Sequence, residues 1–213
     1  MSTDTSTVKV PSVMAVLGEK DIKWGYEASD LANAIRTFKL TLEPERHNFY
    51  PDLDPIFRSI DDIAAKEITT NKGYIQDRRV ERLVSKYIGA VYQHALKKIV
   101  EQELDGHAMK LTKAFVITVP AVWSDKAKCA MLRAVRRADK DLNGVGKSEL
   151  LLEPEAAVIY TLERYKLRGV ENDDSFVVCD AGGGTVDVIS YKVTAVAPRL
   201  RIQELTVPTG ACH

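Results

Sequence analysis

The chain has 213 residues, and its 30 Lys or Arg residues balance 30 Asp or Glu residues, so the formal net charge is zero. This neutrality argues against a nucleic-acid-binding protein, which needs clustered positive charge to displace counterions from phosphates. With 45% hydrophobic and 28% charged residues, the composition is that of one large globular domain or two small ones. Because no apolar run approaches about eighteen residues and no signal peptide is visible, we expect no membrane contact and, by default, a cytoplasmic location.

The three cysteines and four histidines are scattered along the chain. A disulfide framework needs cysteine pairs, and a zinc site needs Cys or His couples at close spacing. Since neither pattern occurs, we expect structural roles for these residues and no zinc site.

The first half of the chain predicts short strands followed by two helices. Residues 8–17 and 38–42 are strand candidates, and the Pro- and Asn-rich stretch 48–55 predicts a loop. Apolar residues then recur every three or four positions over residues 56–68, and again over residues 80–100. Each of these stripes predicts one amphipathic helix.

The second half predicts alternating strands and helices, and then a hairpin. Residues 114–119 form a continuous apolar run, which is typical of a parallel strand covered on both faces. Ser124 is placed to cap the next helix, and Pro154 to begin another. The remaining strand candidates are residues 149–152, 176–179, 186–193 and 200–207. This order predicts an α/β protein with at least one parallel layer.

One phosphate-binding motif can be set aside. Gly146-Lys147-Ser148 resembles the end of a P-loop, but Asp141 stands where that loop needs its first glycine. A P-loop also follows a strand and opens a helix, whereas this segment follows a predicted helix. We interpret it as a turn that leads into the next strand.

The most informative segment is Asp-Ala-Gly-Gly-Gly-Thr-Val-Asp at residues 180–187. Three successive residues without a Cβ allow backbone N–H groups to converge on an anion. Asp180, at the end of a strand, can hold a hydrated Mg²⁺, and Thr185 can offer its hydroxyl to a terminal phosphate. The alternative is a hairpin turn that uses glycine only for positive φ, but such a turn needs neither the acid nor the threonine.

This segment resembles the second phosphate motif of the actin-like ATPases, and most closely that of the 70-kilodalton heat-shock chaperones. Residues 116–125, Val-Ile-Thr-Val-Pro-Ala-Val-Trp-Ser-Asp, resemble the strand-proline-aromatic block of these chaperones. Residues 152–157, Leu-Glu-Pro-Glu-Ala-Ala, resemble their Asn-Glu-Pro-x-Ala-Ala block, with Leu in place of Asn. In addition, Trp-Gly-Tyr-Glu-Ala at residues 24–28 looks like the divergent branch that is common in fungi.

The resemblance implies a fold, a ligand and a set of binding residues. The fold is the actin-like, ribonuclease-H-like ATPase fold, with residues 1–172 in lobe one and residues 173–213 at the start of lobe two. The implied ligand is ATP with Mg²⁺, which Asp180 would hold through water. The residues that would contact the β- and γ-phosphates are Gly182, Gly183, Gly184 and Thr185.

Further roles follow from the same resemblance. Glu153 would position the attacking water or the hydration shell of the metal. Pro120 and Lys128 match the proline and the basic residue that relay nucleotide state in the family, and Asp187 is grouped with them at the interlobe boundary. From the residues alone, Lys128 fits a solvated basic helix face, and Glu153 fits an acid favoured by the helix dipole.

The sequence also departs from the family pattern. The first phosphate motif, Asp-x-Gly-Thr-Thr, is absent before residue 8, and Ser29 occupies the expected position of the catalytic lysine. A serine cannot supply a cation to the transferred phosphoryl group. We therefore expect a truncated chain with two unpaired strand edges in lobe one, which would be prone to aggregate and inactive alone as an ATP hydrolase.

Three classes of function are compatible with these residues. The first is a chaperone-type ATP-binding module, whose partners would include client proteins and co-chaperones. The second is a non-catalytic binding or regulatory module derived from the same fold, which the serine at position 29 favours. The third is another actin-like phosphotransferase, such as a sugar kinase, which the blocks at residues 116–125 and 152–157 disfavour.

Overall fold

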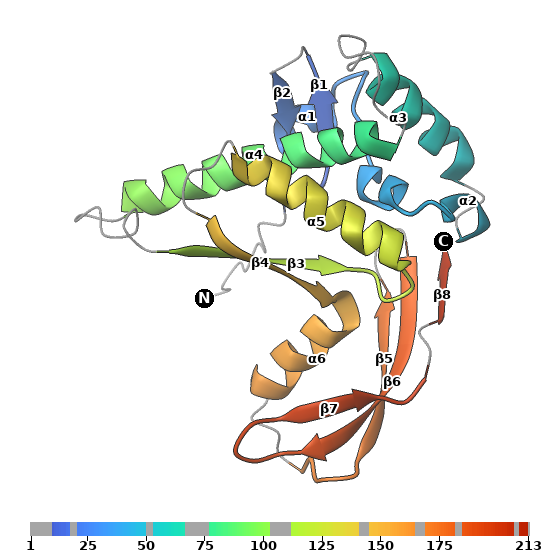
Figure 1. Ribbon diagram of the computed structural model, residues 1–213, viewed down its shortest axis with the longest axis vertical. Helices are drawn as coiled ribbons and strands as arrows, with labels where there is room; N and C mark the ends of the chain where they lie inside the picture. Colours follow the sequence, from blue (N-terminus) through green and yellow to red (C-terminus); the bar gives the residue numbers. More distant parts are fainter. Residues whose placement is uncertain are drawn as a thin grey trace, which may run out of the picture. The chain divides into compact units, whose positions relative to one another are not determined.

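The structure is a computed structural model, shown in Figure 1. The residues it describes are 10–17, 21–49, 53–66, 77–102, 112–140, 145–164, 169–181, 185–206 and 209–212. The chain forms two units, each described by itself below. Unit 1 consists of Met1–Leu42, Pro55–Leu111 and Ala134–Asn143, and unit 2 of Glu43–Asp54, Thr112–Arg133 and Gly144–His213.

Unit 1 combines a small sheet with long helices. Its elements are the antiparallel strands β1 (Met14–Val16) and β2 (Ile22–Trp24), helix α1 (Tyr26–Ser29), the 3-10 helix η1 (Phe38–Leu42), α3 (Asp54–Lys66) and α4 (Asp77–Gln102). Both long helices are confirmed, but their predicted apolar stripes only in part. In α3 Ile60 is buried, whereas Ile56 is 41% exposed and Phe57 is buried instead. In α4 Leu83 and Val84 are buried, whereas Ile99 and Val100 near its end are exposed.

The strand predicted over residues 38–42 is wrong, because this segment is η1. Phe38, Leu40 and Leu42 are all buried, so the alternating pattern does not mark one face of a strand. The ring of Phe38 lies 4.9 Å from that of Tyr87 on α4, and the Thr41 hydroxyl donates to the carbonyl of Phe38. Packing against α4 and this local hydrogen bond therefore favour the tighter helical turn.

Unit 2 begins with a parallel pair of strands. β3 (Lys113–Val119) pairs with β4 (Val145–Leu152), and the register places Ile117 opposite Leu150. Helix α5 (Asp125–Lys140) connects the two strands, so the predicted parallel layer is confirmed. The predicted coverage of both faces of β3 is wrong, since its burial alternates and Val116 is 60% exposed. A continuous apolar run does not by itself distinguish one covered face from two.

The segment Gly146-Lys147-Ser148 lies inside β4, so the turn predicted there is wrong. Its place within a parallel strand agrees with setting aside the P-loop, which would open a helix. Of the loop predicted at residues 48–55, residues 48–49 belong instead to α2 (Arg46–Phe49) and residues 54–55 to α3, and residues 50–52 lie outside the described residues.

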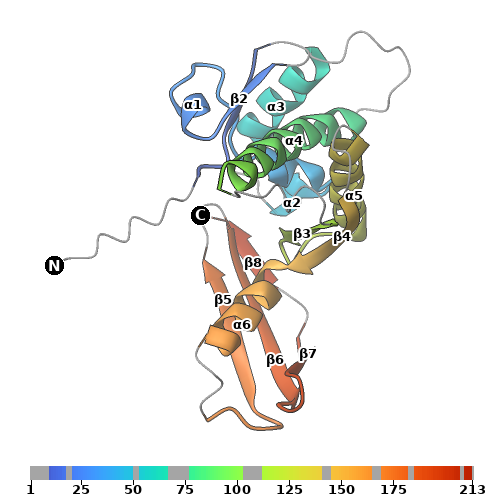
Figure 2. The same ribbon diagram turned by 90° about the vertical axis from the view of Figure 1, so that its left-hand side faces the viewer.

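A four-stranded antiparallel sheet completes unit 2 (Figure 2). β5 (Ser175–Ala181) pairs with β6 (Thr185–Ala195), which confirms the predicted hairpin. The second half of β6 pairs with β7 (Arg201–Glu204), and its first half pairs with β8 (Thr209–Cys212). Helix α6 (Glu153–Arg164) packs against this sheet through Val158, which contacts a core with Ile189 and Tyr191.

Within the described residues, no helix combines the length and the apolar character that a membrane crossing requires.

Candidate functional site

The closed end of the β5–β6 hairpin brings two carboxylates together. In the antiparallel register Asp180 lies directly opposite Asp187, and Ala181 opposite Val186. Directly paired residues project from the same face of a sheet, with Cβ atoms about 4.5–5.5 Å apart. Asp180 is half-buried and Asp187 is 1% exposed. The hairpin therefore holds two acidic side chains next to each other at its closed end.

This acid pair suits a hard cation. Like charges directly opposite each other on two strands destabilise a sheet, and a bound cation reverses that effect. Mg²⁺ prefers one or two carboxylates together with water and substrate phosphates. The donor set of Asp180 and Asp187 therefore fits the predicted magnesium. Gly182, Gly183 and Gly184 lie outside the described residues, as does the side chain of Thr185, so their phosphate contacts stay predictions.

On the side of β6 away from β5, the neighbouring strand at this end is β8. Asp187 lies across from Gly210 in this ladder, and Thr185 across from Cys212. Asp187 thus has a residue without a Cβ on one side and Asp180 on the other. β8 was missed by sequence reasoning, because its Thr-Gly-Ala-Cys sequence lacks the run of β-branched and aromatic residues that predicts a strand.

Helix α6 links Glu153 to the same sheet. Glu153 is the first residue of α6 and is half-buried, and Pro154 after it is buried. Val158, near the middle of the helix, is 4% exposed in the core that contains Ile189 and Tyr191 of β6. Glu153 therefore begins a helix that is packed on the strand carrying Asp187.

Tyr191 is the largest fully buried side chain of that core. Its hydroxyl has no hydrogen-bond partner among the described residues. Burial first, and then the nearby carboxylates of Glu204 and Glu155, raise the pKa of Tyr191 to about 12. Glu204 lies directly opposite Tyr191 in the β6–β7 ladder. This tyrosine is thus held in its neutral form.

The turn between β3 and α5 carries the two predicted relay residues. Pro120 is buried, and its carbonyl accepts the N–H of Trp123 at 3.3 Å. Lys128 lies in the first turns of α5, and its N–H donates to the carbonyl of Ser124 at 3.0 Å. The Ser124 hydroxyl accepts the N–H of Ala127 at 3.3 Å, so the predicted N-cap is confirmed.

Glu43 also belongs to this turn and was missed by sequence reasoning. It is 0% exposed, and its carboxylate accepts hydrogen bonds from the backbone N–H and the hydroxyl of Ser124. The sequence around Glu43 and Pro44 suggested only the end of a strand. No local pattern marks this contact, because its two partners are 81 positions apart.

Ser29, at the position expected for a lysine, has a local structural role in unit 1. Its hydroxyl donates to the carbonyl of Gly25 at 3.1 Å, within helix α1. Its own carbonyl accepts a hydrogen bond from the Arg36 guanidinium at 3.0 Å. The hydroxyl is thus engaged with the backbone of the preceding turn.

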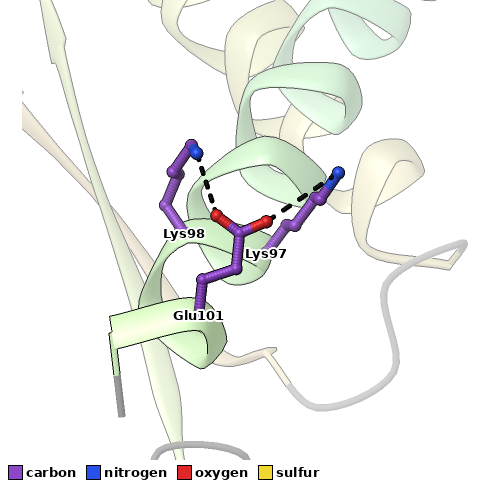
Figure 3. Close-up of polar contacts among 3 residues, drawn as sticks. All are labelled: Lys97, Lys98 and Glu101. Atoms are coloured by element: carbon purple, nitrogen blue, oxygen red, sulfur yellow. Dashed lines mark hydrogen bonds and ion pairs between the residues drawn. The ribbon is translucent and has the colours of Figure 1, made fainter.

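Helix α4 carries an exposed charge cluster, drawn in Figure 3. The ammonium group of Lys98 lies 2.9 Å from one carboxylate oxygen of Glu101, and that of Lys97 lies 3.9 Å from the other. The hydrogen bond from Lys98 is the main cause that lowers the pKa of Glu101, with charge attraction from Lys98 and Lys97 adding to it. Such exposed pairs contribute little to stability and do not define a binding site.

These features define an α/β protein with a parallel β3–α5–β4 crossover and a glycine-connected hairpin that presents two acids. The family model described as "Hsp70 protein" matches residues 54–195, which include the crossover, α6 and the hairpin. The chain therefore belongs to the Hsp70 family. Its mixed α/β structure is consistent with the actin-like ATPase fold that this family implies.

The chain is also similar to a curated protein, the "Chaperone protein HscA homolog" of Chromobacterium violaceum. The two are 40% identical over 102 residues, which are 47% of this chain and 14% of the relative. The matched part is thus a small fraction of that relative's length. The likeness to a fungal branch, the expected truncation and the lobe boundary after residue 172 stay predictions.

Proposed function

We propose that this chain is the ATP-binding part of an Hsp70-type ATPase domain, and that the β5–β6 hairpin binds the phosphates of Mg-ATP. The observation that carries the proposal is the direct pairing of Asp180 with Asp187 at the closed end of the hairpin. The three glycines between these strands add the backbone freedom that a phosphate-binding turn needs.

Each residue of the site has a proposed role. Asp180 would hold magnesium through a water molecule, and Asp187 would add a second negative charge beside it. Glu153, at the start of α6, orients the water that attacks the terminal phosphate. The groups proposed to contact the β- and γ-phosphates are the backbone of Gly182, Gly183 and Gly184 and the hydroxyl of Thr185. When bound, magnesium neutralises charge on the phosphates.

Binding without efficient hydrolysis is the activity we propose for this chain alone. Phosphoryl transfer depends on positioning and on cations that stabilise the transition state. Ser29 has no charge to offer, and its hydroxyl is engaged with the carbonyl of Gly25. This observation favours the second candidate, a non-catalytic module that binds nucleotide and reports it to a partner.

The wider proposals follow from the family. Residues 1–172 would contribute to lobe one and residues 173–213 to lobe two, and the partners would be client proteins and co-chaperones. Pro120 and Lys128 would pass the state of the nucleotide to such a partner. Their common turn at the start of α5 supports a shared role, because both are hydrogen-bonded to the Trp123–Ser124 dipeptide.

A melting experiment tests nucleotide binding. A ligand that binds only the folded state stabilises it by RT ln(1 + [L]/Kd), or about 2.7 kcal/mol at a hundredfold excess over Kd. We expect Mg-ATP and Mg-ADP to raise the melting temperature of the chain. Adenosine, which lacks phosphates, and ATP with a chelator of magnesium should have much smaller effects. Equal effects of adenosine and Mg-ATP would contradict a phosphate-binding hairpin.

A further inference from the structure

Glu43 is a carboxylate in the interior of unit 2. It is 0% exposed, although it directly precedes the exposed residues Pro44 and Glu45. Burying a carboxylate costs free energy unless hydrogen-bond donors and favourable charge surround it. The donors that surround Glu43 therefore indicate what this residue does.

Two of these donors come from Ser124. One carboxylate oxygen, Oε2, accepts the backbone N–H of Ser124 at 2.8 Å, and the other, Oε1, accepts the Ser124 hydroxyl at 3.0 Å. Oε1 also accepts the backbone N–H of Glu45 at 3.0 Å. Ser124 is the N-cap of α5, so the positive end of the helix dipole adds to the attraction. Glu43 thus fastens the start of α5 to the segment before α2.

Ser124, which Glu43 holds, lies between Pro120 and Lys128 in the sequence. The carbonyl of Pro120 accepts a hydrogen bond from Trp123, and Lys128 donates one to the carbonyl of Ser124. Pro120 and Lys128 are therefore each one backbone hydrogen bond away from the Trp123–Ser124 dipeptide. If this dipeptide is held in place, a displacement of Pro120 is transmitted to α5; if it is free, the turn absorbs the displacement.

The structure assigns Glu43 the role of a positioning residue that holds Ser124, so that Pro120 and Lys128 respond to nucleotide together. This assignment rests on the function proposed above, because it takes these two residues to report the state of the nucleotide. Glu43 itself contacts neither of them through a side-chain hydrogen bond, and it acts through Ser124.

Trp123 provides the readout, since it lies inside the turn and is 3% exposed. The chain has two tryptophans, so the Trp24→Phe variant leaves Trp123 as the single reporter. The emission of Trp123 is recorded in this full-length variant without nucleotide, with Mg-ADP and with Mg-ATP. Calorimetry measures the affinity for both nucleotides in parallel. We expect the Mg-ADP and Mg-ATP spectra to differ.

Three substitutions in this background separate positioning from other effects. Glu43→Gln should keep both nucleotide affinities but lose most of the spectral difference, because an amide cannot accept all three hydrogen bonds. Ser124→Ala removes the hydroxyl donor and keeps the N–H, so it should lose a smaller part of the spectral difference. Glu45→Gln is the matched control. It removes the same charge two residues away and keeps the backbone N–H, so it should keep the full difference.

The outcomes are distinguishable. If Glu43→Gln binds nucleotide and keeps the full difference between its Mg-ADP and Mg-ATP spectra, the assignment is overturned and the proposed function stands. If Glu45→Gln loses as much of this spectral difference as Glu43→Gln, the assignment is also overturned, because a general charge effect would then explain both variants. Calorimetry that detects no nucleotide binding by the parent chain would overturn the proposed function, and the assignment with it. A melting curve of each variant shows whether unfolding causes the loss of the spectral difference. Ser124→Ala tests the same Glu43–Ser124 contact by changing the other partner.

Discussion

Asp180 and Asp187 face each other across the β5–β6 ladder, and Asp187 is almost fully buried there. Two acids at directly paired positions lower the stability of a sheet, because like charges repel each other. In the function proposed above, a cation bound beside this pair would offset repulsion between the two carboxylates. Removal of the half-buried Asp180 is therefore expected to change stability and nucleotide binding in opposite directions.

The first prediction concerns Asp180→Asn. Removing one of two facing charges should leave the melting temperature of the free chain unchanged or higher. The affinity for Mg-ATP should fall about 10–100-fold, as is usual when a partner in the outer shell of a metal is lost. Calorimetry at fixed magnesium measures this change. Asp62→Asn, on the exposed side of α3, is the charge-matched control and should leave the affinity unchanged.

The second prediction concerns alkaline pH. Because the pKa of Tyr191 is raised to about 12 by burial and then by Glu204 and Glu155, the folded state keeps this phenol neutral while the unfolded chain ionises near the ordinary value of 10. The resulting stability is complete below about pH 10 and is lost as pH rises toward 12.

Denaturant titrations of the parent and Tyr191→Phe across this range measure the effect. The phenylalanine variant should lose less stability above about pH 10, since it has no phenol to ionise. At neutral pH it should be more stable by about 1 kcal/mol, because it removes a buried hydroxyl that has no partner among the described residues. Substitution of the exposed Tyr160 by Phe is the control, and parallel curves for the parent and Tyr191→Phe would contradict the prediction.

The third prediction concerns Gly25→Ala. Gly25 has a φ of 63°, and a Cβ added there would lie 2.8 Å from Cγ1 of Val10. The substitution should lower the free energy of unfolding by about 1–3 kcal/mol, because both the backbone and the contact are strained. Gly89→Ala is the matched control. Apart from its chain neighbours and the backbone of its own helix, a Cβ at Gly89 in α4 meets no described atom within 4 Å, so alanine should stabilise the helix by about 0.5–1 kcal/mol.

The fourth prediction concerns the charge cluster on α4. Since the hydrogen bond from Lys98 is the main cause of the lowered pKa of Glu101, Lys98→Met should raise that pKa toward its ordinary value. Lys97→Met removes only the more distant attraction, at 3.9 Å, and should raise it less. Acid titration followed by the carboxyl ¹³C signal of Glu101 measures both changes. The small stabilisation from this pair should fade as pH falls through the lowered pKa.

The helices could be predicted because their signal is local. Every turn of α4 repeats the apolar spacing that buries Leu83 and Val84, and Ser124 sits one residue before α5 as a cap should. The segment that became η1 could not be predicted in the same way. Its alternation of apolar residues fits a strand, whereas packing against Tyr87 and the hydrogen bond from Thr41 to Phe38 favour the helical turn.

The hairpin register was implicit in the sequence, since a short glycine connection between two strands places the flanking acids opposite each other. Glu43 could not be found in this way. Its contact with Ser124 joins positions 81 residues apart, and nothing around Glu43 distinguishes it from an exposed acid before a proline. Residues that position a site through the tertiary structure leave little trace in a single sequence.

β6 has a different neighbour along each half of its length. β8 borders Thr185 to Val188, β7 borders Tyr191 to Ala195, and Ser190 marks the changeover by bonding to Leu205 and Thr206. The half of β6 that carries Asp187 is therefore paired with β8 independently of the half that packs against α6 and pairs with β7. Because the two halves have different neighbours, nucleotide binding and release would change the pairing of one half of β6 without unfolding the half in the hydrophobic core.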